Sequence, residues 1–342
     1  MTEIAEAQSA LLAAIVEGLP TMGRRRRDML ANLLDNVVVL AAQDPDPLDL
    51  KIADAALAEL VEAFDVFAPY RGVRKVTIFG SARTRPDSPI YALAHDFARA
   101  IVEDDWMVVT GAGPGIMAAG IHGAGREHSF GVNIRLPFEQ GANEFIIDDD
   151  KLVEMRYFFT RKVMLTKESS AFAVFPGGFG TLDEVFELLT LLQTGKAPPA
   201  PVVLMDTPDG NYWHDWLHFI HSRVVAEGYV SGSDDGFFSI ATSADEAREE
   251  IRRFYANFHS LRHVGDRTVL RLQQAPTEEQ LEEVRRDFGS LLASGDFDVV
   301  EAFDVERATN DFPDLPRLSF TFDRQSFGAL QRLIHRTNTW VD

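Results

Sequence analysis

Three glycine-rich turns follow short apolar runs in this sequence. They are Gly80-Ser81-Ala82 after "VTIF", "TGAGPGIM" (Thr110 to Met117) after "MVV", and "PGGFGT" (Pro176 to Thr181) after "AFAVF". Glycine lets backbone N–H groups approach an anion closely, and a helix that follows adds unpaired N–H groups and the positive end of its dipole. One such turn occurs in any α/β fold, whereas three at one edge of a sheet predict a site for a phosphorylated ligand.

Neither of the two longer turns matches the best-known nucleotide motifs. In "GAGPG" the third glycine comes too early for the dinucleotide fingerprint G-x-G-x-x-G, and Pro114 lies between. In "PGGFGT" the last glycine is followed by Thr181, where a P-loop requires lysine. NAD binding and P-loop chemistry are therefore not the leading interpretations.

Arg161 lies in "MRYFFTRKVML" (155–165), and apolar residues occupy the helical positions around it: Tyr157, Phe158, Met164 and Leu165. A buried guanidinium is costly unless it is paired with an anion. The spacing fits a structural ion pair and a ligand contact equally well. Lys162 is adjacent and would add a second positive charge.

Glu184 also has two readings. Because Thr181 precedes it by three residues, "TLDE" matches a capping box that would start a helix without any enzyme, with Asp183 complementing the helix dipole. A carboxylate beside a phosphate-holding turn also suits cleavage of a glycosidic bond, because that reaction passes through an oxocarbenium-like state with positive charge. The local sequence leaves both readings open.

Two further clusters give weaker signals. His214, His218 and His221 share nearly one helical face in "WHDWLHFIH", but H-E-x-x-H is absent and the interleaved aromatic residues indicate a packed helix rather than a zinc site. The run Arg24 to Arg27 indicates a solvated helix face or a contact for an acidic surface. No G-x-S-x-G elbow indicates a serine hydrolase.

The elements that position these residues follow from the hydrophobic pattern. The runs "KVTIFGSA", "WMVVTGAG", "FGVNIRL", "SAFAVFPGG" and "PVVLMD" alternate with amphipathic helices, which predicts a doubly wound, Rossmann-like α/β fold with a parallel sheet. We expect a helical N-terminal segment (1–70), this nucleotide-binding domain (71–258), and a small α+β C-terminal module of βαββα order (259–342). In that module we expect helices over 277–294 and 326–336 and strands in 267–273, 296–303 and 317–322.

Composition narrows the classes of partner. Lys plus Arg number 33 against 53 Asp plus Glu, so the net charge of −20 offers no global attraction for nucleic acid or an anionic membrane. The sequence has 0 cysteines, which excludes disulfides, thiolate nucleophiles and Cys-ligated zinc. The first twenty residues carry acids where a signal peptide needs basic residues, so we expect a cytoplasmic protein.

Arg161-Lys162 followed by "PGGFGTLDE" (176–184) resembles the paired signatures of the LOG (Lonely Guy) family, once labelled lysine decarboxylase-like. "FGSART", "TGAGPGIM" and "LPFEQGAN" are also similar to its larger bacterial members, and the likeness covers about residues 75–225. Ala118 departs from the "GIMEA" helix of many relatives. Gln140 and Asn143 lie where short members carry an acidic ligand contact.

The resemblance implies a phosphoribohydrolase that cleaves the N-glycosidic bond of a nucleoside 5′-monophosphate, AMP or a cytokinin riboside monophosphate, to free base and ribose 5-phosphate. It implies at least a homodimer and places Arg161 and Glu184 at the catalytic positions. No metal or redox cofactor is required, whereas a decarboxylase would need a lysine that holds PLP. The expected substrate-binding residues are Gly80, Ser81, Thr110, Gly111, Gly113, Gly115, Asn143, Lys162, Gly177, Gly178, Phe179, Gly180, Thr181, Leu182, Asp183 and Thr190.

Two rival interpretations remain at this point. In one, the same turns grip a nucleotide without turnover, and the C-terminal module transmits a regulatory signal. In the other, the reaction is unchanged but the base is a pyrimidine, guanine or a modified adenine.

Overall fold

The computed structural model describes residues 10–11, 14–15, 23–136 and 141–341. The chain divides into two compact units, Met1–Ala58 and Glu59–Asp342. The first unit contains α2 (Arg24–Ala42) and the start of α3 (Pro47–Phe67), which continues into the second unit. The segment expected to be helical over 1–70 is thus helical in 24–42 and 47–67, whereas most of 1–22 lies outside the described residues. Arg24, Arg25 and Arg26 are exposed in the first turn of α2, which itself buries no residue.

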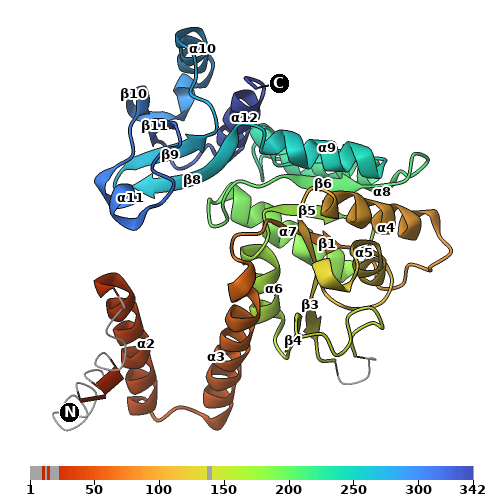
Figure 1. Cartoon of the computed structure of the whole chain (residues 1–342). Helices are drawn as coiled ribbons and strands as arrows, with labels where there is room; N and C mark the ends of the chain where they lie inside the picture. Colours follow the sequence, from red (N-terminus) through yellow and green to blue (C-terminus); the bar gives the residue numbers. More distant parts are fainter. Residues whose placement is uncertain (1–9, 12–13, 16–22, 137–140, 342) are drawn as a thin grey trace. The chain divides into compact units, whose positions relative to one another are not determined.

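The second unit holds a seven-stranded parallel sheet of order β4-β3-β2-β1-β5-β6-β7 (Figure 1). From β1 the chain moves outward on one side through β4, then returns to the other side of β1 at β5. This reversal makes the carboxyl ends of β1 and β5 the topological switch point, where ligands bind in such sheets. The strands are β1 (Lys75–Phe79), β2 (Met107–Thr110), β3 (Ser129–Ile134), β4 (Leu152–Met155), β5 (Ala171–Val174), β6 (Val202–Met205) and β7 (Phe238–Ala241).

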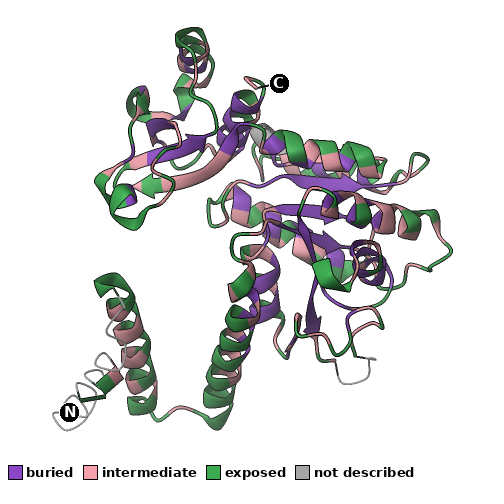
Figure 2. Ribbon diagram, viewed as in Figure 1, coloured by how far each residue is buried: buried purple, intermediate pink, exposed green. Residues whose placement is uncertain are grey.

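Helices cover both faces of this sheet. One face packs against the end of α3 and against α6, α7 and α8, and the other packs against α4, α5 and α9. The central strands β1, β2, β5 and β6 are therefore buried throughout, as Figure 2 shows. The helices are α4 (Pro89–Val102), α5 (Ile116–Ala124), α6 (Phe158–Lys167), α7 (Phe179–Gln193), α8 (Tyr212–Phe219) and α9 (Ala244–Phe254). The predicted Rossmann-like sheet is confirmed.

The sequence pattern did not reveal β4 and β7. Both lie at the edges of the sheet, where one long side has no neighbouring strand, and both are only partly buried. They therefore lack the continuous apolar run by which the central strands were recognised.

The C-terminal part forms a separate antiparallel sheet of order β10-β11-β9-β8. Its elements are β8 (Phe258–Val264), β9 (Arg267–Leu272), α10 (Glu278–Phe288), β10 (Leu292–Val300), α11 (Asp304–Thr309), β11 (Arg317–Phe322) and α12 (Phe327–Asn338). The α+β class is confirmed, but the βαββα order missed β8 and α11. The helix expected over 277–294 is wrong beyond Phe288, because the chain turns at Gly289 and enters β10 at Leu292.

Among the described residues, no helix combines the length and the apolar character that crossing a membrane requires. The division of the chain at residues 70 and 258 stays a prediction.

Candidate active site

A cavity of about 760 Å³ opens at the carboxyl ends of β1, β2 and β5. Its volume lies in the range of sites for small ligands. All three glycine-rich turns reach it, together with one residue of α6 and the start of α7. The lining residues are Ile78, Phe79, Gly80, Ser81, Ala82, Arg83, Gly111, Met117, Ile134, Leu136, Arg161, Gly177, Gly178, Phe179, Gly180, Thr181, Leu182 and Glu184.

The three turns contact one another directly. The Ser81 N–H donates to the Pro176 carbonyl at 3.2 Å, and the Ile116 N–H donates to the Ser81 carbonyl at 3.1 Å. Gly115 has φ +67°, and a Cβ there would lie 2.3 Å from the Ser81 carbonyl oxygen. Glycine is therefore required both by the backbone conformation and by the close approach. The expectation that the turns meet at one edge of the sheet is confirmed.

Two helices begin at these turns without a side-chain cap. Gly115 is the N-cap of α5 and Gly178 is the N-cap of α7, and neither receives a capping hydrogen bond from a side chain. The first N–H groups of a helix have no partner within the helix, and the dipole makes this end positive. The start of α7, which lines the cavity, therefore offers N–H donors to an anion, whereas the first N–H of α5, on Ile116, already donates to the Ser81 carbonyl.

The capping-box reading of "TLDE" is wrong. Helix α7 begins at Phe179, so Thr181 already lies inside its first turn and Glu184 lies in the second. Thr181 is buried, with 6% of its surface exposed, and packs against Gly177, where a Cβ would lie 2.1 Å from the Thr181 hydroxyl oxygen. The Glu184 side chain is thus free of the helix start and available to the cavity.

Glu184 forms an ion pair with Arg161. The Arg161 Nη1 donates to the Glu184 Oε1 at 3.2 Å, and the Arg161 Nε donates to the Val132 carbonyl at 2.9 Å. Only 9% of the Arg161 side chain and 14% of the Glu184 side chain are exposed. The acid that pairs with Arg161 is therefore the second catalytic candidate, and both side chains line the cavity.

Burial dominates the electrostatics of this pair. Loss of water raises the pKa of the Glu184 carboxyl from 4.5 to about 7, although the positive charges of Arg161 and Lys162 oppose the change. Burial likewise lowers the pKa of the Arg161 guanidinium, and Glu184 offsets part of that effect. A carboxyl that titrates near neutral pH in a cavity is typical of a functional site.

Helix α6 is held in place by a carboxylate from α3. Glu59, of which 8% is exposed, accepts from the Arg156 N–H at 2.9 Å and from the Thr160 hydroxyl at 2.6 Å. A negative charge at the start of a helix is favourable, and here it fixes the helix that carries Arg161. Sequence reasoning missed Glu59, because 97 positions separate it from the Arg156 N–H that it binds.

Several predicted ligand residues support the turn after β2 instead of lining the cavity. The Asn143 amide donates to the Ala112 and Gly113 carbonyls, each at 2.9 Å, and the Thr110 hydroxyl accepts from the Ala112 N–H at 3.0 Å. These bonds hold Ala112 at φ +58°, which is unfavourable for a residue with a side chain. Gly111 does line the cavity, and a Cβ there would lie 1.9 Å from the Arg161 Nη2.

Lys162, Asp183 and Thr190 also lie outside the cavity lining. Lys162 pairs with Asp183, and the Thr190 hydroxyl donates to the Phe186 carbonyl one turn earlier in α7. Gln140 lies outside the described residues. Conversely, the lining includes seven residues that were not among the expected site residues: Ile78, Phe79, Ala82, Arg83, Met117, Ile134 and Leu136. Only Arg83 carried a signal, as a cation beside the first glycine turn.

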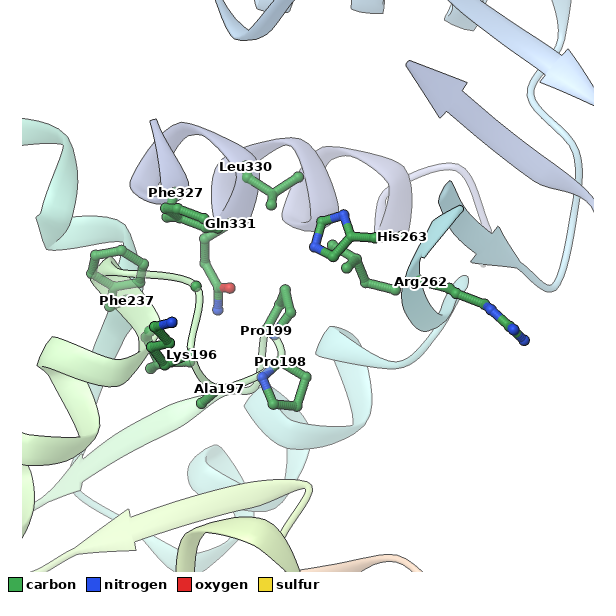
Figure 3. Close-up of a pocket in the computed structure, with 13 residues that line it drawn as sticks. Lys196, Ala197, Pro198, Pro199, Phe237, Arg262, His263, Phe327, Leu330 and Gln331 are labelled. Atoms are coloured by element: carbon green, nitrogen blue, oxygen red, sulfur yellow. The ribbon is translucent and has the colours of Figure 1, made fainter. Parts of the chain in front are cut away.

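A second cleft of about 210 Å³ lies between the loop after α7 and α12. Pro198, Pro199, Phe237, Phe327 and Leu330 form much of its wall (Figure 3), and its lining includes no carboxylate. The guanidinium of Arg262 points away from it, toward its ion-pair partner Asp311. This cleft has no pair of acid and cation, so the larger cavity is the candidate active site.

The histidine helix does not form a metal centre among the residues that the structure describes, where no group of three or more His, Asp or Glu could hold an ion. Trp213 of α8 is fully buried and donates to the Met205 carbonyl at 3.0 Å. The interleaved aromatic residues thus pack the helix onto the sheet, as expected.

The fold and the cavity define a Rossmann-like α/β protein with a candidate ligand site at the switch point of its sheet. A family model described as "Possible lysine decarboxylase" matches residues 115–251. The "Probable cytokinin riboside 5'-monophosphate phosphoribohydrolase LOG6" of Arabidopsis thaliana is 32% identical over 160 residues, covering 46% of this chain and 75% of that protein. The chain belongs to this LOG family.

Two further proteins each match slightly more than half of the chain. The "Probable cytokinin riboside 5'-monophosphate phosphoribohydrolase LOG4" of Oryza sativa subsp. japonica is 28% identical over 198 residues, covering 57% of this chain and 83% of that protein. The solved molybdenum cofactor carrier protein from Chlamydomonas reinhardtii is 17% identical and covers 53% of this chain and 97% of that chain, with a TM-score of 0.38.

Proposed function

We propose that this protein is a phosphoribohydrolase that acts on nucleoside 5′-monophosphates, AMP or a cytokinin riboside 5′-monophosphate. The buried Arg161–Glu184 pair carries the proposal, because it shares one cavity with three anion-binding turns. A helix start alone needs no buried guanidinium, whereas a bound phosphoribosyl group does. The names of the plant relatives describe this reaction for those proteins.

The phosphate would bind at the start of α7. Gly177, Gly178, Gly180 and Thr181 line the cavity there, and the uncapped helix start supplies N–H donors. Arg83, on the loop after β1, also lines the cavity and would add a positive charge. The net charge of −20 makes such local features necessary for an anionic substrate.

The chemistry is an addition of water across the glycosidic bond. The bond between C1′ of the ribose and the base nitrogen breaks, the water oxygen bonds to C1′, and a water proton goes to the base. The transition state carries positive charge on the ribose, and an ionised Glu184 would stabilise that charge and orient the water. Arg161 would hold Glu184 and the ribose or phosphate side of the substrate.

The name of the family model suggests a different reaction. A PLP-dependent decarboxylase needs a lysine that forms a Schiff base with the cofactor. The lining described above contains no lysine, and Lys162 is bound to acids outside it. The geometry therefore favours glycosidic cleavage.

The proposed assembly is at least a homodimer. Helix α6 presents Phe158, Phe159 and Val163 on its surface, with 54%, 52% and 47% of each exposed. Exposed apolar side chains that lie together are typical of a protein interface.

Gly180→Ala should separate ligand binding from folding. No atom lies within 4 Å of a Cβ built at Gly180, and the residue lies in α7, where alanine is favoured over glycine by about 1 kcal/mol. We expect the free energy of unfolding to stay equal or to rise by up to about 1 kcal/mol. The added methyl group would stand beside the proposed phosphate, so KM should rise at least about tenfold. Chemical denaturation and steady-state kinetics measure the two quantities.

Gly72→Ala is the matched control for this variant. A Cβ at Gly72 also meets no atom within 4 Å, and Gly72 lies on the loop before β1, outside the cavity lining. Its KM should equal that of the wild type. An unchanged KM for Gly180→Ala would contradict the proposal that the substrate phosphate binds at this turn.

The pH dependence of kcat/KM should report Glu184. Its carboxyl has a pKa of about 7 in the folded protein, so below pH 7 it is mostly neutral and cannot stabilise a cation. We expect kcat/KM, which follows groups of the free enzyme, to rise through a midpoint near pH 7 and level off above it. The same shift should make folding less favourable as the pH rises from 4.5 to about 7, because the folded state must release a proton that it binds more tightly. A profile that falls above pH 7 would instead make Glu184 a general acid.

The primary test is incubation with a panel of adenine, guanine, pyrimidine and cytokinin nucleoside monophosphates. Free base and ribose 5-phosphate are followed by chromatography, and binding is measured by calorimetry. Release of base from one or more of them is the expected result, and the panel identifies the preferred base. Measurable binding without any release would instead indicate a nucleotide-binding regulatory protein.

A further inference from the structure

Lys162 follows Arg161 in α6 but does not share its surroundings. Its ammonium lies 2.8 Å from the Asp183 Oδ2 and 2.6 Å from the Glu187 Oε2, and 15% of its side chain is exposed. It is absent from the lining of the cavity. Successive residues of a helix point about 100° apart, so Arg161 reaches into the cavity while Lys162 reaches along the outside of α7.

The two acids that Lys162 binds flank Glu184 on α7. Asp183 and Glu187 are separated by four residues in the helix, so they are neighbours on its surface and repel each other as like charges. Lys162 bridges them and offsets that repulsion. A helix surface that carries Asp183, Glu184 and Glu187 so close together depends on such a counter-charge.

The charged groups that act on Glu184 come from two helices. They are Arg161 and Lys162 on α6 and Asp183 and Glu187 on α7. Arg83, on the loop after β1, lines the same cavity. Burial raises the pKa of Glu184 most, Arg161 and then Lys162 lower it, and Asp183 and Glu187 raise it. Burial also lowers the pKa of Lys162, but its hydrogen bonds to Asp183 and Glu187 raise it by more, so Lys162 stays charged.

We propose that Lys162 is a positioning residue that neutralises Asp183 and Glu187, so that the Glu184 carboxylate between them stays ionised and directed at Arg161. Lys162 makes no contact with the substrate. This inference rests on the proposed function of the Arg161–Glu184 pair. It differs from the ligand contact that the family resemblance implies for this residue.

Lys162→Met tests the proposal through the pH profile. With the ammonium gone, two uncompensated carboxylates flank Glu184, so the midpoint of the kcat/KM profile should move upward by on the order of one pH unit. At pH 6 the variant should be about tenfold less active than the wild type. Two units above the midpoint the two proteins should agree within about twofold, and the affinity for ribose 5-phosphate, measured by calorimetry, should be kept.

Three further variants keep the test decisive. Lys162→Arg retains the charge and should restore the wild-type midpoint. Glu187→Gln removes one of the flanking negative charges and should move the midpoint in the opposite direction, which gives a result even if Lys162→Met does not fold. Lys167→Met removes a charge from the same helix at a residue that pairs with Glu168, and it should leave the profile unchanged.

A different set of results would overturn the proposal. If Lys162→Met raises KM tenfold and weakens ribose 5-phosphate binding at every pH, with the midpoint unchanged, Lys162 is a ligand contact. Failure of the proposed function is recognised separately, as absence of base release by the wild type. In that case infrared titration of the carboxyl groups, with Glu184→Gln to assign the band, still shows whether Lys162→Met moves the Glu184 titration upward.

Discussion

Glu184→Gln is expected to lower kcat/KM by about 10²- to 10³-fold above pH 8, the usual effect of removing one group that stabilises charge in a transition state. The neutral amide has almost the same shape, but it cannot balance positive charge on the ribose. Folding should not be weakened near pH 7, because burial disfavours the charged Glu184 carboxylate in the folded wild type, whereas the amide carries no charge. We expect the free energy of unfolding to stay equal or to rise, by up to about 3 kcal/mol. Base release and chemical denaturation measure the two effects.

The control for this variant is the same change in a second glutamate that is paired with an arginine. Glu154 on β4 pairs with Arg135 at 2.6 Å and lies outside the cavity. Glu154→Gln should retain wild-type kcat/KM and the midpoint of the pH profile. Glu184→Gln should lose the midpoint near pH 7 altogether. If it keeps a third or more of the activity, Glu184 has no part in the chemical step.

Arg161→Met should have the largest effect on stability. The methionine fills much of the same space, but it leaves Glu184 as a buried carboxyl without its partner and the Val132 carbonyl without its donor. Breaking a buried ion pair in this way costs about 3–5 kcal/mol in the free energy of unfolding. Activity should fall to background, since the cavity loses its one buried cation among the residues described and Glu184 becomes harder to ionise.

A double-mutant cycle measures the interaction energy between Arg161 and Glu184, apart from the loss of their other contacts. Combining Arg161→Met with Glu184→Gln removes both charges, so the double variant should be more stable than Arg161→Met alone. Arg135→Met is the matched control, because the Arg135 side chain is 62% exposed and such surface pairs contribute at most about 1 kcal/mol. If Arg161→Met costs no more than Arg135→Met, Arg161 is not the buried cation on which the proposed site depends.

Much of the fold was predictable from local pattern. The strands β1, β2, β3, β5 and β6 are continuous apolar runs because both of their faces are buried. The short edge strands β4 and β7 and the partly exposed β8 do not carry that signal, because only part of each is buried. These strands form only because another strand pairs with them in the tertiary structure, and local sequence does not show that pairing.

For the candidate site, too, some features could be predicted from the local sequence and others could not. The turns at Gly80, Gly115 and Gly178 were visible in the sequence, because glycine and a following helix are local requirements of a strand-to-helix turn. The residues that hold the site together were not visible. Glu59 at the start of α6 and Asn143 on the turn after β2 act on atoms that lie far away in the sequence.

The sequence by itself determined the fold class, the three glycine-rich turns and the two residues on which the proposed chemistry depends, because spacing and residue type express local constraints. It could not decide whether Glu184 caps a helix or whether Arg161 pairs with a structural acid. Only the tertiary structure decided both, since it starts α7 at Phe179 and brings α6 and α7 together at the switch point of the sheet. A side chain's partner and its exposure to water depend on which helices pack together, and no local pattern contains that information.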